Sequence, residues 1–232
     1  MLETLQQFDQ DLFFYINGIT SPYFDKFMWF FTAKFTWAPL YAAILYVIWK
    51  NFSIGMSLLL VIMIVGVIIF SDQICASVIR PEIQRMRPSN PNNPISEFVH
   101  IVNGKRGGRY GFPSCHAANS FGLAFAVMLF FKRKSLTYFF LSWALINSYS
   151  RVYLGLHYPG DLFGGLIVGV IGAYISYFIY KGIIKSSYIE KLLKFKTNDY
   201  KILSNSSKIQ HHNIIIFTGL TTLLVIVIIA AF

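Results

Sequence analysis

The sequence predicts an all-helical membrane bundle, and three observations support this fold class. Of the 232 residues, 55% are hydrophobic and only 13% are charged, which is about half the charged fraction of an ordinary soluble domain. Several apolar stretches are long enough to cross roughly 30 Å of hydrocarbon as helices. Prolines, glycines and cations gather between them. We expect one polytopic domain over residues 1–232, with six transmembrane helices preceded by an amphipathic helix.

The first 20 residues predict the amphipathic helix. Hydrophobic side chains recur at helical spacing from Leu2 to Ile16, acids and glutamines lie between them, and Asn17-Gly18 is a stop signal. Such a segment lies in the membrane interface. It has no basic start followed by a short apolar core and a small-residue cleavage site, so we do not interpret it as a signal peptide.

Six apolar runs predict the spans. The first covers residues 27–49 and is interrupted by Lys34, which can snorkel to the interface or face the bundle. The second covers residues 54–79 and is rich in Ile, Val, Leu and Met. The other four, of which the first two are short, cover residues 117–131, 136–153, 162–180 and 213–232.

The connections between the spans predict the orientation. Eleven of the twenty lysines and arginines fall in alternate connections with only two acids, and the other side holds nine cations with eight acids. Positive charge is retained in the cytoplasm, so the first set is expected there, including the basic loop over residues 181–212. The extramembrane loop over residues 80–115 and the connection around His157 are then expected to face outward.

Two arginines begin the outward loop. Arg80 and Arg87 are seven residues apart, which is two turns of a helix, so both can point the same way. Guanidinium groups bind phosphate oxygens in bidentate pairs and therefore suit an anionic head group. Taken alone, arginines at this position are more typical of lipid-facing residues at the membrane interface.

A Pro-Ser turn leads into the third predicted span. Ser114 is expected at the N-terminus of that helix, where unpaired backbone N–H groups and the helix dipole favour an anion. His116 follows in the first turn. By itself, it would be read as an ordinary capping or interfacial histidine.

Residues 150–161, which connect the fourth and fifth predicted spans, contain the most candidate catalytic side chains. Arg151 is a further phosphate ligand, and His157 precedes Asp161 by four residues. A carboxylate holds an imidazole in one tautomer and stabilises its positive charge, which leaves the other nitrogen free to attack or to accept a proton. A His–Asp pair is commonly structural. Three polar stretches on one side of the membrane, however, predict a single phosphate site.

Together these stretches resemble the type 2 phosphatidic acid phosphatases, in their bacterial integral-membrane branch. The family pattern is a lysine, six residues and Arg-Pro; then Pro-Ser-Gly-His; then Ser-Arg, five residues, His, three residues and Asp. The matching positions are Arg80 with Arg87-Pro88, then Pro113 to His116, then Ser150-Arg151, His157 and Asp161. The resemblance covers residues 80–161, and the six-span plan is also like that of the membrane-bound members.

The resemblance implies a mechanism. His157 would attack phosphorus and form a phosphohistidine, oriented by Asp161, while His116 would protonate the leaving oxygen. Water would then release phosphate. The phosphoryl oxygens would be held by Arg80, Arg87, Ser114, Cys115 and Arg151. No metal or other cofactor takes part in this scheme, and the sequence shows no cluster of carboxylates that would build a magnesium or zinc site.

Two positions depart from the family pattern. Arg80 stands where lysine is usual, which keeps the charge but enlarges the donor group. Cys115 replaces the usual glycine, so a backbone N–H is still available but close approach is more crowded. Cys115 also allows a rival interpretation as a thiolate nucleophile. An arginine loop should follow such a thiol, whereas here an apolar helix follows, so Cys115 and Cys75 are interpreted as packing residues.

Weaker candidates lie in the outward and cytoplasmic loops. Lys105, Arg106 and Arg109 could form a basic lip that meets the head group or a second phosphate, or could simply be solvated. His211-His212 make a poor metal site by themselves and are expected at the membrane interface. The lysines of residues 181–208 are expected to touch anionic lipid.

The resemblance therefore predicts a lipid phosphatase of a bacterial inner membrane, working at the outer leaflet with its site facing the periplasm. Undecaprenyl diphosphate and lipid A are the leading expected substrates, followed by phosphatidylglycerol phosphate and phosphatidic acid. The basic lip favours a head group with more than one phosphate. The expected partners are the lipid substrate and the bilayer, and nucleic acid is not expected.

Two other classes stay open. A lipid or solute transporter could use the same anion site, although transporters place charges along a path through the membrane and these charges cluster at one surface. A vanadate-dependent haloperoxidase has a similar anion site, but those relatives are soluble.

Overall fold

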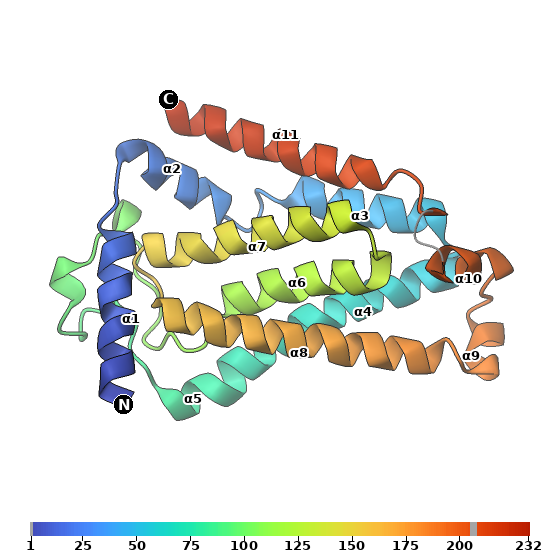
Figure 1. The fold of residues 1–232 in the computed structure, drawn as a ribbon, viewed down its shortest axis with the longest axis horizontal. Helices are drawn as coiled ribbons and strands as arrows, with labels where there is room; N and C mark the ends of the chain where they lie inside the picture. The colour runs from blue at the N-terminus through green and yellow to red at the C-terminus, as the bar shows by residue number, and fades with distance from the viewer. Residues whose placement is uncertain (1, 205–207) are drawn as a thin grey trace.

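The computed structural model describes residues 2–204 and 208–232, which form helices joined by turns and loops, with no β-strand among them. Six helices of 14 to 25 residues run roughly along the long axis of the molecule (Figure 1). They are α3 (Ala38–Asn51), α4 (Ile54–Gln73), α6 (Cys115–Phe131), α7 (Lys134–Tyr153), α8 (Pro159–Ile183) and α11 (His212–Ala231). The prediction of an all-helical bundle is confirmed.

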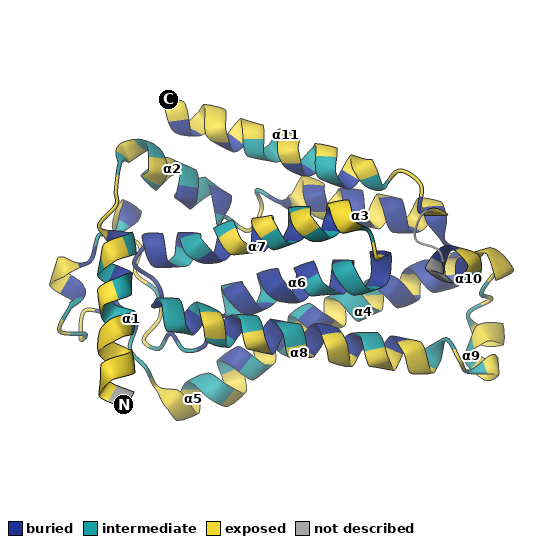
Figure 2. Ribbon diagram, in the orientation of Figure 1, coloured by how far each residue is buried: buried dark blue, intermediate teal, exposed yellow. Residues whose placement is uncertain are grey.

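Helix α6 occupies the centre of the bundle. Most of its residues are buried, and it packs against α4, α7 and α8 (Figure 2). Helix α8 comes close to it because Gly165 and Gly169 face α6, where any side chain would overlap backbone atoms of Ser114 or Ala118. Small residues allow such close packing between membrane helices. The N-termini of α6 and α8 are thereby held together, and the Ser114 N–H donates to the Asp161 carbonyl oxygen at 2.9 Å.

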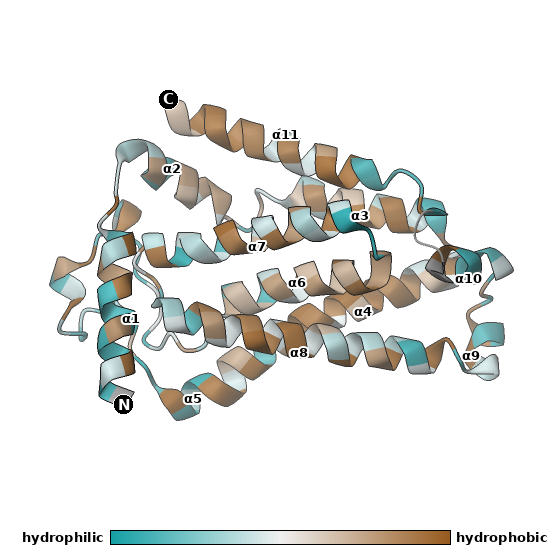
Figure 3. Ribbon diagram, viewed as in Figure 1, coloured by the Kyte–Doolittle hydropathy of each residue, from teal (hydrophilic) through white to brown (hydrophobic). Residues whose placement is uncertain are grey.

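Apolar residues dominate the long helices, and hydrophilic residues gather towards the two ends of the bundle (Figure 3). Among the described residues, three helical stretches are long and apolar enough to cross a membrane: residues 54–83, 159–183 and 212–231. Helix α6 is apolar but shorter, at 17 residues. The chain is therefore a helical membrane bundle.

The first predicted span is wrong as a single helix. Residues 27–49 are divided between α2 (Pro22–Phe31) and α3, with a break between them. In the break, the Trp37 indole N–H donates to the Phe31 carbonyl oxygen at 2.7 Å, and Pro39, which has no N–H, lies in the first turn of α3. Lys34 consequently lies in the break between α2 and α3 and is not part of a transmembrane helix.

The second predicted span is longer than expected, and the outward loop is shorter. Helix α4 continues through a π-helical turn, η1 (Ile74–Ile79), into α5 (Arg80–Ile83). The Arg80 N–H donates to the Cys75 carbonyl oxygen in the π register just before Pro81, and the helix ends at Gln84, whose φ is 50°. The loop therefore begins at residue 84, and Arg80 belongs to a helix.

The expected interfacial helix corresponds to α1 (Leu2–Asn17), which lies across one end of the bundle (Figure 1). Residue 1 lies outside the described residues. Phe13 is fully buried against Tyr158, with ring centroids 5.4 Å apart. The Asn17 side chain donates to the Tyr153 carbonyl oxygen at 2.8 Å and accepts from the His100 N–H at 2.8 Å. Helix α1 thus fastens the outward loop to the end of α7.

The basic segment lies at the opposite end of the bundle. It contains α9 (Ser187–Leu192) and α10 (Thr197–Ser204), and residues 205–207 of the predicted loop lie outside the described residues. The Asp199 carboxylate accepts from the Ser53 hydroxyl at 2.5 Å and from the Ser53 N–H at 2.9 Å. This contact anchors α10 to the start of α4.

Candidate active site

His157 lies at the centre of the candidate site, in the turn between α7 and α8. Its Nδ1 is 3.1 Å from Asp161 Oδ2, in the first turn of α8, and its Nε2 is 2.5 Å from Arg87 Nη1. A guanidinium group can only donate, so the network assigns the ring proton to Nδ1, which donates to Asp161. The lone pair of Nε2 therefore faces the guanidinium group of Arg87. The predicted His–Asp pair is present.

Burial keeps the His157 ring uncharged. Only 2% of the residue is exposed, and this burial lowers its pKa well below the ordinary value of a histidine, with the charges of Arg87, Arg151 and Arg80 acting in the same direction. A neutral imidazole keeps its Nε2 lone pair available at neutral pH. The site therefore presents a nucleophile or base to whatever binds beside Arg87.

Arg87 is held by backbone carbonyl groups. Its Nε donates to the Tyr110 carbonyl oxygen at 3.0 Å and its Nη1 to the Leu156 carbonyl oxygen at 2.9 Å. Gly107 packs directly on its side chain, leaving no room for a Cβ. Burial, followed by the charge of Arg80, lowers the pKa of Arg87 to about 10, so the group remains positive at neutral pH. A fixed, buried cation of this kind suits an anion.

Arg80 approaches the site from α5. Its Nη2 donates to the Pro113 carbonyl oxygen at 3.0 Å and to Cys115 Sγ at 2.8 Å. The two helical turns predicted between Arg80 and Arg87 are absent, because the helix ends at residue 83 and Arg87 is reached by extended chain. The charges of Arg80 and Arg87 nevertheless act on each other across the site.

Ser114 and Cys115 form the start of α6. Ser114 is fully buried at the N-cap, and its hydroxyl oxygen accepts from the Ala117 N–H at 3.4 Å, as the Pro-Ser turn predicted. Cys115 packs against the free thiol of Cys75 in the π turn. The replacement of the usual glycine thus fills a space beside Arg80.

Arg151 closes the site from the last turn of α7. Its Nη1 donates to the Thr32 hydroxyl at 3.1 Å, and its carbonyl oxygen accepts from the N–H groups of Leu156 and His157. Its buried Nε, like that of Arg80, has no hydrogen-bond partner within residues 2–204 and 208–232. Buried donors without partners are costly unless a ligand supplies acceptors. The two guanidinium groups therefore offer donors to an anion.

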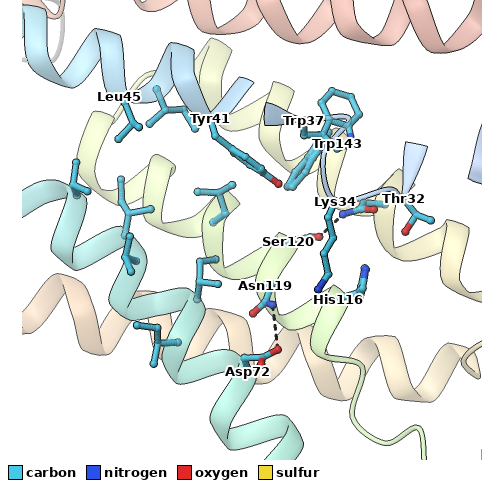
Figure 4. A pocket seen from close by; sticks show the side chains of 18 of the residues that line it. Thr32, Lys34, Trp37, Tyr41, Leu45, Asp72, His116, Asn119, Ser120 and Trp143 are labelled. Carbon is cyan, nitrogen blue, oxygen red and sulfur yellow. Dashed lines mark hydrogen bonds between the residues drawn. The ribbon is translucent and has the colours of Figure 1, made fainter. Parts of the chain in front are cut away.

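His116 lies on the other side of the site, in the first turn of α6. Its titratable neighbours include Arg151, His157 and Lys34. Its ring makes no hydrogen bond to any residue that the structure describes. It lines a pocket between α3, α4, α6 and α7, and its side chain points towards that pocket (Figure 4). The structure thus brings the two predicted histidines to one site with different surroundings.

The sequence analysis missed Arg85 and Asp9. Arg85 Nη1 contacts Asp161 Oδ1 at 3.1 Å, its Nη2 contacts Asp9 Oδ2 in α1 at 2.6 Å, and its guanidinium carbon lies 4.0 Å from the centroid of the Tyr158 ring. Asp9 also accepts from the Gly160 N–H at 2.7 Å. The signal was the spacing of Arg85 and Arg87, which share one face of an extended segment.

The three residues of the predicted basic lip do not converge. Lys105 lies over Trp29 at 5.5 Å, Arg109 lies over Tyr110 at 5.2 Å, and Arg106 donates to the Ser89 carbonyl oxygen at 2.7 Å. Each contact stays within the loop or reaches α2. Arg106 thus supports the backbone beside Arg87, and the lip offers no second cluster of cations.

The fold and this site define a class of protein: a helical membrane protein with an arginine-lined anion site beside a buried histidine. The profile of the PAP2 superfamily matches residues 56–185. This match and the relatives described next show that the chain belongs to the PAP2 superfamily. The family resemblance predicted from three short motifs is confirmed.

Two relatives are similar over most of their length. The chain is 46% identical over 228 residues to a lipid A 4'-phosphatase of Bacteroides thetaiotaomicron, covering 98% of this chain and 97% of that protein. It is 32% identical over 180 residues to a lipid A 4'-phosphatase of Porphyromonas gingivalis, covering 78% of this chain and 75% of that protein. The fold is similar to the crystal structure of Aquifex aeolicus LpxE, with a TM-score of 0.56 and 23% identity, covering 72% of this chain and 93% of that one.

Proposed function

We propose that this protein is an integral-membrane lipid phosphatase that removes a phosphate group from a phosphorylated glycolipid of the lipid A type. The observation that carries the proposal is His157, whose neutral ring is fixed by Asp161 and whose Nε2 faces Arg87. Similarity over nearly the whole chain to a lipid A 4'-phosphatase favours lipid A as the substrate. Undecaprenyl diphosphate is the second candidate, and phosphatidylglycerol phosphate and phosphatidic acid follow.

The first step is attack of His157 Nε2 on phosphorus. A new N–P bond forms, the P–O bond to the lipid breaks, and His116 gives a proton to the leaving oxygen. For this the Arg87 Nη1 group turns from Nε2 to a phosphoryl oxygen. The charge of the transition state is stabilised by Arg80, Arg87, Arg151, the Ser114 hydroxyl and the backbone N–H group of Cys115 at the start of α6.

The second step releases phosphate. Water attacks the phosphohistidine, His116 takes a proton from that water, and the N–P bond breaks. Asp161 accepts the hydrogen bond from Nδ1–H throughout and stabilises the positive ring, so that Nε2 is both a good nucleophile and a good leaving group. Arg85 holds Asp161 in this position through the second carboxylate oxygen. The scheme uses only side chains and backbone groups of this protein and water.

We also propose six spans, with the site facing the periplasm from the inner membrane. The long helices α3, α4, α6, α7, α8 and α11 supply the six crossings, with α2 completing the first. Helix α1 and the loop over residues 84–114 lie at one end, and the lysine-rich segment with α9 and α10 lies at the other (Figure 1). The excess of cations at the second end supports its placement in the cytoplasm.

Phosphate release by the purified protein in detergent tests the proposal. Lipid A, undecaprenyl diphosphate and phosphatidic acid are offered in parallel with a metal chelator present, and His157→Ala is the control. We expect release from lipid A that the mutation abolishes. Release from none of the lipids, or equal release by His157→Ala, would overturn the proposal.

A further inference from the structure

A pocket of about 660 Å³ lies between α3, α4, α6 and α7 (Figure 4). Ligand sites occupy roughly 300–1,000 Å³, so it can hold part of an amphiphile. His116 lines one end. Leu45 and Val65 line another part and are 50% and 48% exposed on apolar helices, so the pocket opens towards lipid. The pocket therefore connects the membrane with the candidate active site.

The face of α6 that lines this pocket changes from polar to apolar along the helix. His116, Asn119, Ser120 and Leu123 occupy positions i, i+3, i+4 and i+7 of the helix, which places them on one face. The polar end is nearest the active site, and hydrocarbon side chains line the remainder (Figure 4). An amphiphile with its head near His116 and its chain along α6 would match this gradient.

Lys34 reaches into the polar end. It lies in the break between α2 and α3, and its side chain extends towards His116 and Asn119 (Figure 4). No carboxylate forms an ion pair with it among the residues that the structure describes. It lines this pocket together with His116, whereas Arg80, Arg87, Arg151 and His157 do not line it. Lys34 therefore stands on the leaving-group side of His116, where the lipid lies, and away from the transferred phosphate.

Three buried polar atoms at this end have no hydrogen-bond partner in the described ranges of the chain. They are Asn119 Oδ1, Asn147 Oδ1 and Trp143 Nε1. The Asn147 amide nitrogen donates to Ser120 Oγ at 2.7 Å, and that of Asn119 donates to Asp72 at 3.5 Å, which leaves both oxygens as acceptors. These buried atoms thus provide two acceptors and, with Lys34, two donors, and the Asp72 carboxylate also lines the pocket. A plain hydrocarbon would leave all of them unpaired.

We propose that this pocket receives one acyl chain of the lipid substrate and selects a chain that carries both donors and acceptors near its head, such as an amide linkage or a hydroxyl group. Lys34 and Trp143 bind its carbonyl oxygen, and Asn119 and Asn147 accept from its N–H or O–H. The apolar part of the pocket holds the rest of the chain. This inference rests on the proposed lipid phosphatase activity and makes the pocket a specificity site for that activity.

Kinetics with two synthetic glycolipids test the selection. One is glucosamine 4-phosphate with a 12-carbon acyl chain attached to its nitrogen as an amide, and the other is glucose 4-phosphate with a 12-carbon alkyl chain attached at the same ring carbon through an ether oxygen. For the wild-type protein, kcat/KM should be higher for the amide. Lys34→Met and Asn119→Leu should each reduce this preference by about tenfold, because each removes a hydrogen bond that only the amide makes. Lys34→Arg should retain most of it.

Lys26→Met is the matched control, because Lys26 is a lysine of α2 outside this pocket. It should leave the preference unchanged. Equal losses on the two glycolipids in Lys34→Met would contradict the proposal, since Lys34 would then act on the phosphate. An unchanged preference in both pocket variants, or the same loss in Lys26→Met, would also overturn it.

A binding measurement tests the pocket independently of turnover. Trp37 and Trp143 line it and are buried, so a brominated acyl chain in the pocket should quench their fluorescence. In a His157→Ala protein that also carries Trp29→Phe and Trp49→Phe, we expect saturable quenching by the brominated amide glycolipid. Val65→Phe and Lys34→Met should weaken it several-fold. Quenching that does not saturate, or that is equal in all variants, would contradict the pocket assignment even if the phosphatase activity is found.

Discussion

His157 and His116 lie at one site but in opposite kinds of surroundings. Both ring nitrogens of His157 have partners, Asp161 and Arg87, and the ring is buried in the turn before α8. The His116 ring makes no hydrogen bond within the described chain and lines an open pocket. A nucleophile must hold one orientation towards phosphorus, whereas an acid must meet a leaving group that arrives with the substrate. The difference supports the proposed roles, with His157 as the nucleophile and His116 as the acid.

The same difference divides the surroundings into two regions. Arginines gather around His157, and two of their buried nitrogens lack partners within the described residues. Around His116 there are one lysine, a set of amide groups, the Asp72 carboxylate and then hydrocarbon. In the proposed mechanism the transferred phosphate lies in the first region and the lipid in the second. The scissile bond would lie between the two histidines.

The largest expected loss of turnover comes from a mutation in the His157 region. His157→Ala removes the nucleophile, and we expect turnover to fall by about a thousandfold or more. Phosphate release under saturating lipid measures it. A folded His157→Ala protein that retained substantial turnover would show that another group attacks phosphorus.

The next largest loss of turnover is expected for His116→Ala, and its dependence on the leaving group distinguishes the two histidines. His116→Ala removes the acid, and turnover of a lipid alkyl phosphate should fall by about 10²- to 10⁴-fold. A phenolic leaving group needs no proton, so the loss should be much smaller with an aryl phosphate. His157→Ala should be inactive with both substrates. If both variants depended equally on the leaving group, the assignment of roles would be wrong.

A mutation of Arg85 tests whether His157 depends on the contact between Arg85 and Asp161. Arg85→Leu leaves one oxygen of the buried Asp161 carboxylate without its cation and should reduce kcat by about 10- to 100-fold with a small change in KM. Asp9→Asn, which acts on Arg85 from α1, should have a weaker effect in the same direction. A change confined to KM would instead place Arg85 in substrate binding.

The pKa of His157 predicts a pH dependence of stability. Below about pH 6.5 the unfolded chain binds a proton at this histidine, whereas the folded protein, with its lowered pKa, does not. The free energy of unfolding should therefore fall by up to about 1.4 kcal/mol per pH unit as the pH decreases below that value. Thermal unfolding in detergent measures it. His157→Gln should show a flatter profile, and identical profiles would contradict a neutral His157.

The smallest expected effect concerns Cys115. Cys115→Ser keeps a small acceptor for Arg80 and the backbone N–H at the start of α6, so most of the turnover should remain. If Cys115→Ser lost turnover while His157→Ala remained active, the nucleophile would be the Cys115 thiol and not His157.

Hydropathy located most of the helices within a few residues. The predicted runs at residues 136–153, 162–180 and 213–232 correspond closely to α7, α8 and α11. It could not place the break at Lys34, because a window average hardly responds to one lysine among apolar residues. It also ended the second span too early, because Pro81 and Arg80 are typical of a loop and the π turn that carries the helix past them has no sequence signature.

The three motifs identified Arg80, Arg87 and Arg151 and the two histidines, because the turns that hold these residues fix their spacing within each motif. Arg85 was missed because its partners, Asp9 and Asp161, are distant in the sequence and meet only when α1 crosses the end of the bundle. The acceptors of the lipid pocket were missed for a similar reason. Asn119 and Asn147 lie inside apolar runs on different helices, and only packing places their oxygens in one pocket.

Trapping the covalent intermediate tests the central claim most directly. A lipid labelled in its phosphate is mixed with the protein in detergent, quenched in base within one turnover, and the labelled peptide is identified by mass spectrometry. The account predicts a phosphoramidate on His157, stable to base and labile to acid, and absent from His157→Ala. Label on Cys115 or His116, or full turnover with no label on His157, would contradict it.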